Sequence, residues 1–450
     1  MKKVHFIAIG GSAMHNLALA LSREGYVVSG SDDEIAEPSR SRLLREGILP
    51  EQQGWFPDKI QHDLDLVILG MHARSDNPEL LRAIELDIPV FSYPEYLYER
   101  SKSKTRVVIG GSHGKTTITS MILHVLNYCG IETDYMVGAQ LEGFDIMVRL
   151  SETAKWMVFE GDEYLTSPLD PKPKFLHYHP DIALISGIGW DHMNVFPTFD
   201  SYLEQFRLFV GSISTGGQLI WFGEDHYLKE IAREAHCKTT PYFVHPHETS
   251  NEKTFLLRPE DAAVDLQVFG SHNMANVSAA LQVCLSMGVD INSFYDAISS
   301  FKGASRRLEM IWKQNGCSAY RDFAHAPSKV KASVKALREQ FPDKKLIACL
   351  ELHTYSSLSK SFLNQYHGTL NEADAAIVFY DPHAVELKKL PPLDFDFIRH
   401  SFNHSNLIVF SDISELDQYL KSIFIANTFV VFMSSGNFAG YDFTNLKSYL

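Results

Sequence analysis

The sequence predicts an α/β protein with parallel sheets, divided into two or three domains. Two observations support this fold class. Short apolar segments alternate with stretches of helical character along the whole chain, which is the pattern of strands followed by covering helices. At 450 residues the chain is also too long for one hydrophobic core, because single cores stop growing beyond ~250–300 residues.

Three blocks of predicted strands follow one another. The first ends in the polar segment Glu99–Thr105, the second begins with the strand Arg106–Ile109 and reaches a helix that opens near His272, and the third starts around Arg307. We therefore expect domains at residues 1–104, 105–303 and 304–450. Further strands are expected at Val4–Ile9, Tyr26–Val28, Leu64–Leu69, Ile88–Phe91, Trp156–Phe159, Ile182–Ser186, Leu346–Leu350, Ala376–Phe379, Leu407–Phe410 and Phe429–Phe432.

Charge and composition exclude several classes of protein. The formal net charge of -14 argues against a general affinity for nucleic acid or for anionic membranes. No stretch approaches the ~20 apolar residues that cross a bilayer, and the first apolar run is broken at Gly10 and Gly11, so it predicts a strand and not a signal peptide. The five cysteines are scattered and never form a C-x-x-C pair, which indicates reduced core thiols. We expect a cytoplasmic protein with no nucleic-acid or membrane partner.

The strongest local motif is Gly110-Gly-Ser-His-Gly-Lys-Thr-Thr117, which follows a buried strand and opens a helix predicted to run from Thr116 to Tyr128. Glycines there let backbone N–H groups approach phosphate oxygens, and the helix N-terminus adds its dipole. Lys115 would neutralise the terminal phosphates and Thr116 would offer a hydroxyl to Mg²⁺. Ile109 stands where the strict motif requires its first glycine, so this is a shortened variant of the nucleotide-binding loop.

Two polar clusters follow other strands of the second block. The strand Trp156–Phe159 runs into Glu160-Gly-Asp-Glu163, and Ile182–Ser186 leads to Trp190-Asp-His192. Ligands gather at the carboxyl ends of parallel strands, so Lys115, Glu160 and His192 are expected to converge. A carboxylate and an imidazole beside phosphates suit a Mg²⁺ ion. Each residue alone also fits a structural role, such as a helix cap or a hydrogen-bonded core histidine.

The N-terminal loop Ile9-Gly-Gly-Ser-Ala-Met14 also joins a strand to a helix, and Asp32 lies about twenty residues further on. Such a loop offers backbone amides to a diphosphate, and such an acid binds a ribose or base. Asn16 stands at the third glycine position. Alone, this motif would indicate a nicotinamide oxidoreductase. Two phosphate-binding loops in consecutive domains indicate instead ATP in one domain and a nucleotide-linked substrate in the other.

Together these segments resemble the Mur ligases of peptidoglycan metabolism. Gly111–Thr117 is similar to their ATP loop, and Glu160–Tyr164 and Asp191–Met193 are similar to their Mg²⁺ segments. The segments His272–Asn276, Arg306–Glu309 and Arg321–Pro327 follow in the family's order and spacing. The resemblance covers essentially the whole chain. It implies a Rossmann-like N-terminal domain for the UDP-substrate, a central P-loop ATPase-like α/β domain, and a Rossmann-like C-terminal ligase domain.

The resemblance also implies roles for single residues. The catalytic residues would be Lys115, Glu160, His192 and Arg307, and Mg²⁺ would be held by Thr116, Glu160 and His192. ATP would contact Gly111, His113, Gly114, Lys115, Thr116, Thr117, Asn273, Asn276, Arg307 and Asp322. The UDP-substrate would contact Gly10, Gly11, Ser12, Ala13, Met14, Ser31 and Asp32. On the residues alone, a helix cap at His272-Asn273, a solvated pair at Arg306-Arg307 and a turn at Asp322 remain open.

Within the family, Gly10–Met14 and Ser29–Asp32 resemble the branch that takes UDP-N-acetylmuramate. Two activities compete there: addition of the tripeptide L-Ala-γ-D-Glu-meso-diaminopimelate in peptidoglycan recycling, and addition of L-alanine in biosynthesis. The Tyr after the Glu160 cluster, the segment Lys174–Tyr178 and the acid at Glu351 are more similar to the tripeptide ligase. The acceptor would then contact Glu351, His353, Tyr355 and Ser356.

The sequence departs from the family pattern at two places. Arg321 and Ala326 stand where these branches often have an Asp and a second His. Some branches use a carboxylated lysine shortly after the Asp-His pair, but no lysine occurs between His192 and Lys229.

The chemistry that the resemblance implies begins with transfer of the ATP γ-phosphoryl group to the lactyl carboxylate. The acyl phosphate is then attacked by the neutral amine of the acceptor, so catalysis is mainly positioning and charge stabilisation. The base that takes the amine proton stays unassigned between His353 and His325. A P-loop ATPase or kinase without an amine acceptor, and a nicotinamide oxidoreductase, are the alternatives from other enzyme classes.

Overall fold

The computed structural model describes residues 1–71, 73–141, 143–167, 169–190, 193, 195–258 and 262–449. The chain forms two compact units. The first comprises Met1–Trp190, Pro197–Phe243 and Ser278–Ala297, and the second comprises Asp191–Phe196, Val244–Val277 and Ile298–Leu450. Both units combine largely parallel sheets with helices, so the predicted α/β class is confirmed.

The first sheet of the first unit is entirely parallel, in the order β2-β1-β3-β4. It is packed on a core that includes Ile7, Val67, Leu69 and Leu80. Since β1 lies between β2 and β3, the Gly10 loop that follows β1 opens at the point where the strand order reverses, where open α/β sheets bind ligands. Its elements are β1 (Lys3–Ile7), α1 (Ser12–Arg23), β2 (Val27–Ser31), α2 (Ser39–Glu46), η1 (Pro57–Lys59), β3 (Leu66–Leu69), α3 (Pro78–Glu85), β4 (Val90–Ser92) and α4 (Tyr93–Ser101).

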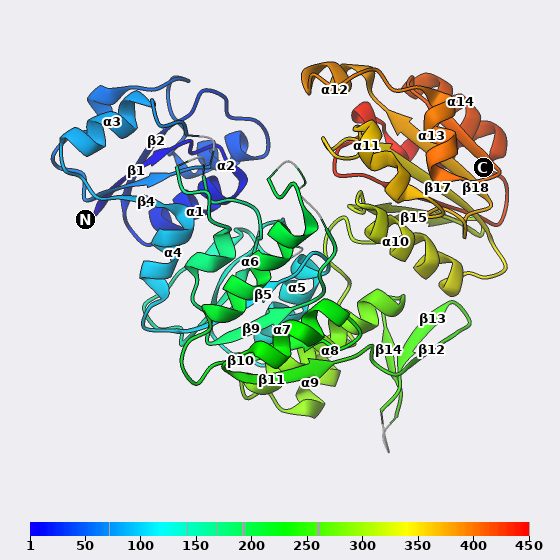
Figure 1. Ribbon diagram of the computed structural model, residues 1–450, viewed down its shortest axis with the longest axis horizontal. Helices are drawn as coiled ribbons and strands as arrows, with labels where there is room; N and C mark the ends of the chain where they lie inside the picture. Colours follow the sequence, from blue (N-terminus) through cyan, green and yellow to red (C-terminus); the bar gives the residue numbers. More distant parts are fainter. Residues whose placement is uncertain are drawn as a thin grey trace. The chain divides into compact units, whose positions relative to one another are not determined.

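A seven-stranded sheet follows, in the order β11-β10-β9-β5-β8-β6-β7, parallel except for the β6–β7 pair. Helix α5 packs on β5 and β8, and α7 packs on β10 (Figure 1). The central strand β5 thus has β9 on one side and β8 on the other. The elements are β5 (Thr105–Gly110), α5 (Lys115–Tyr128), β6 (Thr133–Met136), β7 (Val148–Arg149), β8 (Trp156–Glu160), η2 (Lys174–His177), β9 (Ile182–Ile185), α6 (Phe199–Gly211), β10 (Gln218–Phe222), α7 (His226–Glu234) and β11 (Lys238–Tyr242).

The second unit contains a small antiparallel sheet and a six-stranded sheet. The small sheet comprises β12 (His247–Ser250), β13 (Lys253–Leu256) and β14 (Val264–Leu266). Thr254 Oγ1 donates to Gln340 Oε1 at 2.8 Å, and Gln340 Nε2 donates to the Glu252 carbonyl at 2.6 Å, so the small sheet is attached to the helix that carries Gln340. Helices α8 (Ser271–Ser286) and α9 (Ile291–Ile298) follow it in the chain.

The six-stranded sheet has the order β15-β16-β20-β17-β18-β19 and is parallel except for the β15–β16 pair. Alternate residues of β17 enter two different cores: Leu350 packs with residues of α10 and α13, and Cys349 packs with residues of α14. Helices therefore cover both faces. The elements are β15 (Glu309–Gln314), β16 (Cys317–Asp322), α10 (Pro327–Gln340), β17 (Lys345–Leu352), α11 (Lys360–Leu363), η3 (Asn364–Tyr366), β18 (Ala375–Tyr380), α12 (Pro382–Leu387), α13 (Phe395–Phe402), β19 (Leu407–Phe410), α14 (Ile413–Ile423), β20 (Thr428–Met433), η4 (Phe438–Gly440) and η5 (Phe443–Tyr449).

The predicted strands are all present, with small differences at their ends. The largest difference is at Tyr26–Val28, where β2 runs from Val27 to Ser31. The predicted polar linker 99–105 is also shorter than expected, because α4 continues to Ser101 and β5 begins at Thr105. Glu99 and Arg100 lie in the last turn of α4, and a hydrophobicity pattern does not separate the polar end of a helix from a loop. The boundaries 1–104, 105–303 and 304–450 stay predictions.

Candidate active site

The nucleotide loop after β5 has the backbone that its glycines predict. Gly111 and Gly114 have φ values of +118° and +74°, and a Cβ at Gly111 would lie 2.4 Å from Ser186 Oγ, so a side chain cannot be accommodated there. Helix α5 begins at Lys115 with Gly114 as its N-cap residue and has no side-chain cap. No side chain at the N-cap accepts from the first N–H groups of α5, and a helix N-terminus of this kind is the arrangement that binds phosphate.

Thr116 and Glu160 are brought together, as the sequence predicted. Both side chains are buried, and the Thr116 hydroxyl donates to Glu160 Oε1 at 2.6 Å. Glu160 ends β8, next to β5, and its other oxygen accepts a hydrogen bond from the Gly138 N–H at 2.9 Å. A hydroxyl and a carboxylate at the N-terminus of α5 are the oxygen ligands that Mg²⁺ prefers beside phosphates, so these residues fit the ion. His192, the third predicted ligand, lies outside the described residues.

The Lys115 ammonium already has a partner that the sequence did not assign. Its Nζ lies 2.6 Å from Glu163 Oε2 and donates to the Gly111 carbonyl at 2.7 Å. Burial disfavours the charged ammonium, but the carboxylates of Glu163, Asp162 and Glu160 outweigh this and raise the pKa of Lys115 above its ordinary value. Lys115 is therefore fully charged at neutral pH. Glu163 belongs to the same motif as Glu160 and lies three residues after it, and this spacing was the only indication in the sequence that Glu163 is part of the site.

Two other predicted ATP-loop residues have structural neighbours. The His113 ring lies against Gly189, where a Cβ would come within 2.7 Å of His113 Cε1. Ser186 Oγ donates to the His113 carbonyl. Thr117 is buried in the first turn of α5. The loop is thus anchored to the segment that follows β9.

In the N-terminal loop, Asp32 faces the loop itself. Its Oδ2 accepts a hydrogen bond from the Gly10 N–H at 2.7 Å, and Gly10 is needed because a Cβ would lie 2.9 Å from that oxygen. Ser31 is fully buried and its hydroxyl accepts a hydrogen bond from Lys59 Nζ at 3.2 Å. Met14 is buried in α1. Asp32 and Ser31 therefore support the predicted UDP-substrate loop. Lys59 lies beside Ser31 and is a cation to which the sequence assigned no role.

The presence of Asn16 at the third glycine position has a structural explanation. Its Nδ2 donates to the Ser12 carbonyl at 2.8 Å and its Oδ1 accepts from the Met147 N–H at 2.9 Å. The preceding residue, His15, to which the sequence assigned no role, contacts Arg42, with 3.2 Å between His15 Nε2 and Arg42 Nη1. Since α1 is held by side-chain contacts, it does not require the close backbone approach that a glycine gives.

Asp32 predicts a pH dependence of stability. Burial raises the pKa of its carboxyl from the ordinary 3.8 to about 6. The folded chain therefore binds a proton more tightly than the unfolded chain, and stability falls as pH rises from ~4 to ~6. In Asp32→Asn this fall should be absent, measured by hydrogen exchange of the peptides that cover β1 and β2 at several pH values. Asp58→Asn, which changes an exposed carboxylate of the same sheet region, is the control and should keep the wild-type profile. An unchanged profile in Asp32→Asn would contradict the assignment.

The predicted adenine residues lie in the first turns of α8. Asn276 Nδ2 donates to Asn273 Oδ1 at 3.3 Å, and Asn273 Nδ2 donates to the Phe269 carbonyl at 2.9 Å. His272 is near Asp322 and Glu339: burial lowers the pKa of its imidazole, and these two acids partly offset that effect. Asn273 lies in the first turn of α8, which begins at Ser271, and its role toward adenine stays a prediction.

The other two predicted nucleotide residues of the second unit are Arg307 and Asp322. The Arg307 guanidinium lies 4.7 Å from the centroid of the Phe323 ring. Asp322 ends β16, is buried, and accepts a hydrogen bond from the Ser333 hydroxyl. Their roles toward ATP stay predictions.

The four predicted acceptor residues differ in their surroundings. Glu351 is 2% exposed and its Oε2 accepts hydrogen bonds from the Ser434 hydroxyl and from the Phe438 N–H, the latter at 2.9 Å. His353 Nδ1 lies 3.8 Å from Glu351 Oε1, whereas Tyr355 is half-exposed and Ser356 is partly buried. Glu351 thus fixes the turn after β20, and His353 and Tyr355 are the accessible members of the set.

The departure at Arg321 has a local explanation. Arg321 is paired with Glu309 across the β15–β16 ladder, and its Nη2 donates to Glu309 Oε2 at 2.9 Å. Where the family often has an acid, this chain therefore has a cross-strand ion pair on a half-exposed surface.

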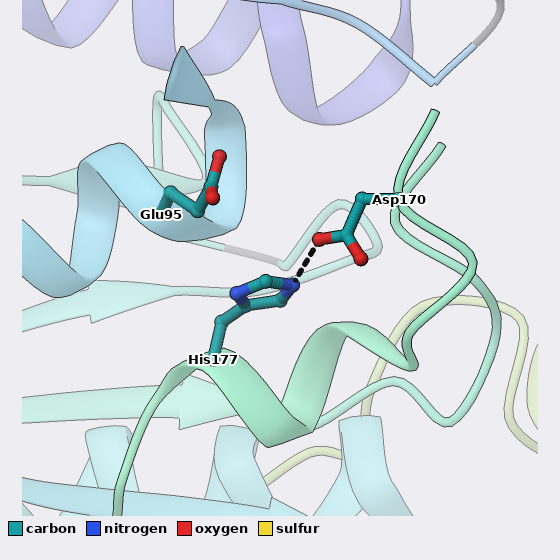
Figure 2. Close-up of side chains that lie close together, drawn as sticks. All are labelled: Glu95, Asp170 and His177. Carbon is teal, nitrogen blue, oxygen red and sulfur yellow. Dashed lines mark ion pairs between the residues drawn. The ribbon is translucent and has the colours of Figure 1, made fainter. Parts of the chain in front are cut away.

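Among the described residues, one group of three side chains has the spacing of a metal site: Glu95, Asp170 and His177, whose nearest ligand atoms all lie within 4.8 Å of one another (Figure 2). Asp170 Oδ2 is 2.8 Å from His177 Nε2. Glu95 Oε2 accepts hydrogen bonds from Ser92 and closes the capping box of α4. An ion pair and a helix cap explain these contacts, so we assign no ion to them.

The fold and this site define a P-loop-type α/β enzyme that acts on nucleotides. The chain matches the models of the Mur ligase middle domain at residues 109–284, of the Mur ligase family catalytic domain at residues 3–105 and of the Mur ligase glutamate ligase domain at residues 306–436. Within the described residues, no helix has the length and apolarity to span a membrane.

Proteins with a similar sequence or fold agree with these matches to the Mur ligase models. The chain is 30% identical to UDP-N-acetylmuramate–L-alanine ligase of Aquifex aeolicus, over 84% of this chain and 83% of that protein. It is similar to the solved UDP-N-acetylmuramate:L-alanyl-γ-D-glutamyl-meso-diaminopimelate ligase from Neisseria meningitides, with 27% identity and a TM-score of 0.61 over 68% of this chain and all of that one. UDP-N-acetylmuramate–alanine ligase from Thermotoga maritima has a TM-score of 0.71 at 20% identity, over 100% and 98% of the two chains. The chain belongs to the Mur ligase family and is an ATP-dependent amide-bond ligase.

Proposed function

We propose that this ligase couples the carboxylate of UDP-N-acetylmuramate to the tripeptide L-Ala-γ-D-Glu-meso-diaminopimelate. The observation that carries the proposal is the similarity to the tripeptide ligase of Neisseria meningitides, which is covered over its whole length at 27% identity. The acid at Glu351 and Tyr164 after the Glu160 cluster agree with it. The alternative is L-alanine as acceptor, which the 30% identity to the Aquifex enzyme favours.

The residues of the first unit support phosphoryl transfer from ATP. Lys115 carries a full positive charge at the N-terminus of α5, where the terminal phosphates would lie, and the free N–H groups of that helix would hold their oxygens. Because an acyl phosphate forms with little covalent help from the protein, this positioning and charge stabilisation are the chain's contribution. The acceptor amine then displaces phosphate from the acyl group.

Mg²⁺ is part of the proposal. Thr116 and Glu160 would hold it, with His192 as the third predicted ligand. The ion supplies charge neutralisation between the phosphate groups. Thr116 and Glu160 are already buried and hydrogen-bonded to each other, so the chain provides this oxygen pair in a fixed orientation.

We further propose that the three predicted domains, 1–104, 105–303 and 304–450, divide the work between UDP-substrate, ATP and acceptor. A cytoplasmic location fits the cysteines, because all five are free thiols, as expected in a reducing compartment.

The test is ligation by the purified protein with ATP, Mg²⁺ and UDP-N-acetylmuramate, followed by phosphate release and product mass. We expect kcat/KM for the tripeptide to exceed that for L-alanine by at least ~10²-fold, because a site built to bind polar groups strongly rejects an acceptor that lacks them. The dipeptide L-Ala-γ-D-Glu is the control for length. Preference for L-alanine would establish the alternative, and no product with any acceptor would overturn the UDP-N-acetylmuramate assignment.

A further inference from the structure

His15 lies in the first turn of α1, beside the predicted UDP-substrate loop, and is 2% exposed. Its Nδ1 is 2.9 Å from the Gly11 carbonyl oxygen and 3.1 Å from Ser39 Oγ. Its Nε2 is 3.1 Å from Asn16 Nδ2 and 3.2 Å from Arg42 Nη1. The imidazole therefore joins the loop before α1 to helix α2, which carries Ser39 and Arg42.

The neighbours of Nε2 determine where the ring is protonated. The Arg42 guanidinium has only donors, and the Asn16 amide is oriented by its Oδ1, which accepts from the Met147 N–H at 2.9 Å. Two donors therefore point at Nε2, which must offer a lone pair. The single proton of the neutral imidazole is then on Nδ1, from which it is donated to the Gly11 carbonyl. A second proton on Nε2 would face two N–H donors, so this packing disfavours the imidazolium.

The electrostatic surroundings of His15 agree with this assignment. Burial lowers the pKa of the imidazole below its ordinary value of 6.5, the hydrogen bond to the Gly11 carbonyl opposes this, and the Arg42 guanidinium lowers the pKa again. Arg42 is held from its other side, where Nη2 donates to the Asp145 carbonyl and Nη1 donates to Gln140 Oε1 at 3.3 Å. These contacts keep the guanidinium against Nε2, so His15 is neutral at pH ~7.

The proton on Nδ1 fixes one peptide group of the loop. The Gly11 carbonyl accepts from the His15 ring and also from the His15 backbone N–H, each at 2.9 Å. Because the C=O and N–H of a trans peptide point in opposite directions, a carbonyl held toward the helix directs the Ser12 N–H away from it, past the N-terminus of α1. Gly11 is the N-cap residue of α1, and no side chain there accepts from the first N–H groups. These are the donors that a diphosphate at this loop would use.

We propose that His15 is a positioning residue for the UDP-substrate: as the neutral Nδ1–H tautomer, it holds the Gly11–Ser12 peptide in the orientation that binds the diphosphate. Because the imidazole is buried behind the loop, it affects the affinity for the substrate and not the chemical step. Arg42 and Asn16 select the tautomer, and through it they act on the loop. This inference rests on the proposed use of UDP-N-acetylmuramate and concerns the same loop.

The test is binding of UDP-N-acetylmuramate to the full chain by calorimetry at neutral pH. His15→Asn keeps an N–H at the position of Nδ1, so its affinity should stay within ~3-fold of wild type. His15→Gln keeps an acceptor for Arg42 but carries its amide one methylene further from the Gly11 carbonyl, and His15→Leu has neither function. Both of these variants should bind the substrate ~10-fold more weakly, the effect of one lost hydrogen bond at a buried group.

Steady-state kinetics distinguish positioning from general damage to the fold. In His15→Gln and His15→Leu the KM for UDP-N-acetylmuramate should rise by the same factor, whereas kcat and the KM for ATP should stay within ~2-fold of wild type. His62→Asn changes an exposed histidine of the same sheet region and should behave as wild type. If His15→Leu does not fold, the comparison of His15→Asn with His15→Gln, which carry the same amide, still tests the role of the Nδ1 proton.

Equal affinities of His15→Asn and His15→Gln would overturn the inference, and so would a fall in kcat without a rise in the KM for the UDP-substrate. UDP-N-acetylglucosamine, which carries the same nucleotide and diphosphate, distinguishes this failure from failure of the proposed function. If wild type binds it but not UDP-N-acetylmuramate, the muramate assignment fails, and the same order of affinities is expected with UDP-N-acetylglucosamine. If wild type binds neither compound, the proposed UDP-substrate fails, and this inference fails with it.

Discussion

Replacing Lys115 by methionine is expected to lower kcat for ligation by at least ~10²-fold, the size of effect seen when one donor aimed at developing charge is removed. Lys115 follows the central strand β5 and is held between the Gly111 carbonyl and Glu163. Methionine has similar length but no charge, so the γ-phosphoryl group would lose its main electrostatic partner.

The measurement is phosphate release and product mass with saturating UDP-N-acetylmuramate and acceptor. Lys155→Met, which changes an exposed lysine just before β8, is the matched control and should keep wild-type activity. Because Lys115→Met leaves Glu163 buried without its cation, its thermal unfolding must be compared with wild type at the assay temperature. A folded Lys115→Met protein with kcat within tenfold of wild type would contradict the assigned role.

The part of this site that the sequence predicted is the part that follows from sheet topology. Lys115, Thr116 and Glu160 come after neighbouring parallel strands, and the carboxyl ends of such strands meet at one edge. The hydrogen bond between Thr116 and Glu160 brings two of these residues together, whereas His192, the other member of the predicted group, lies outside the described residues. The same argument explains why Asp322, which ends β16, and Ser434, which follows the neighbouring strand β20, are close: the Ser434 N–H donates to the Asp322 carbonyl at 2.9 Å.

Side-chain partners were not predictable in this way. Whether an acid after a strand binds an ion, caps a helix or pairs with a lysine depends on rotamers and on residues distant in sequence. Glu163 accepts a hydrogen bond from Tyr202, which lies on a helix 39 residues further along the chain. Asp32 turned toward Gly10, although its spacing is equally that of a ribose ligand. Charge and spacing therefore predict where the site lies, but packing determines which side chains in the site contact each other.

Packing also reveals a buried hydrogen-bonded pair, His5 and Glu79, that no motif indicated. His5 lies on β1 and Glu79 in the first turn of α3, both are fully buried, and His5 Nε2 is 3.2 Å from Glu79 Oε2. Glu79 Oε1 accepts a hydrogen bond from the Phe56 N–H at 2.7 Å. This carboxylate thus joins β1, α3 and the segment before η1 within the sheet that carries the Gly10 loop.

Glu79→Ala is expected to destabilise this region by ~3–5 kcal/mol, the usual effect of removing one partner from a buried pair. The loss has two sources: His5 and the Phe56 N–H are left buried without their acceptor, and a cavity forms. Since a chain of several domains does not unfold in one step, the loss is read from hydrogen exchange of the peptides that cover β1 and β3. Glu85→Ala on the same helix removes an exposed partner of Arg82, and its effect should stay below ~1 kcal/mol.

The pH dependence gives a second, independent readout of Glu79. Burial would raise the pKa of this carboxyl, but hydrogen bonds from His5, Ser31 and the Phe56 N–H outweigh it and lower the pKa below its ordinary value of 4.5. The stability that Glu79 contributes is therefore complete above pH ~4.5 and is lost as pH falls through the folded pKa. Wild type and Glu79→Ala should differ most at neutral pH and converge in acid. A difference that stays constant with pH would mean that Glu79 acts only by filling space, and not as a carboxylate held by three donors.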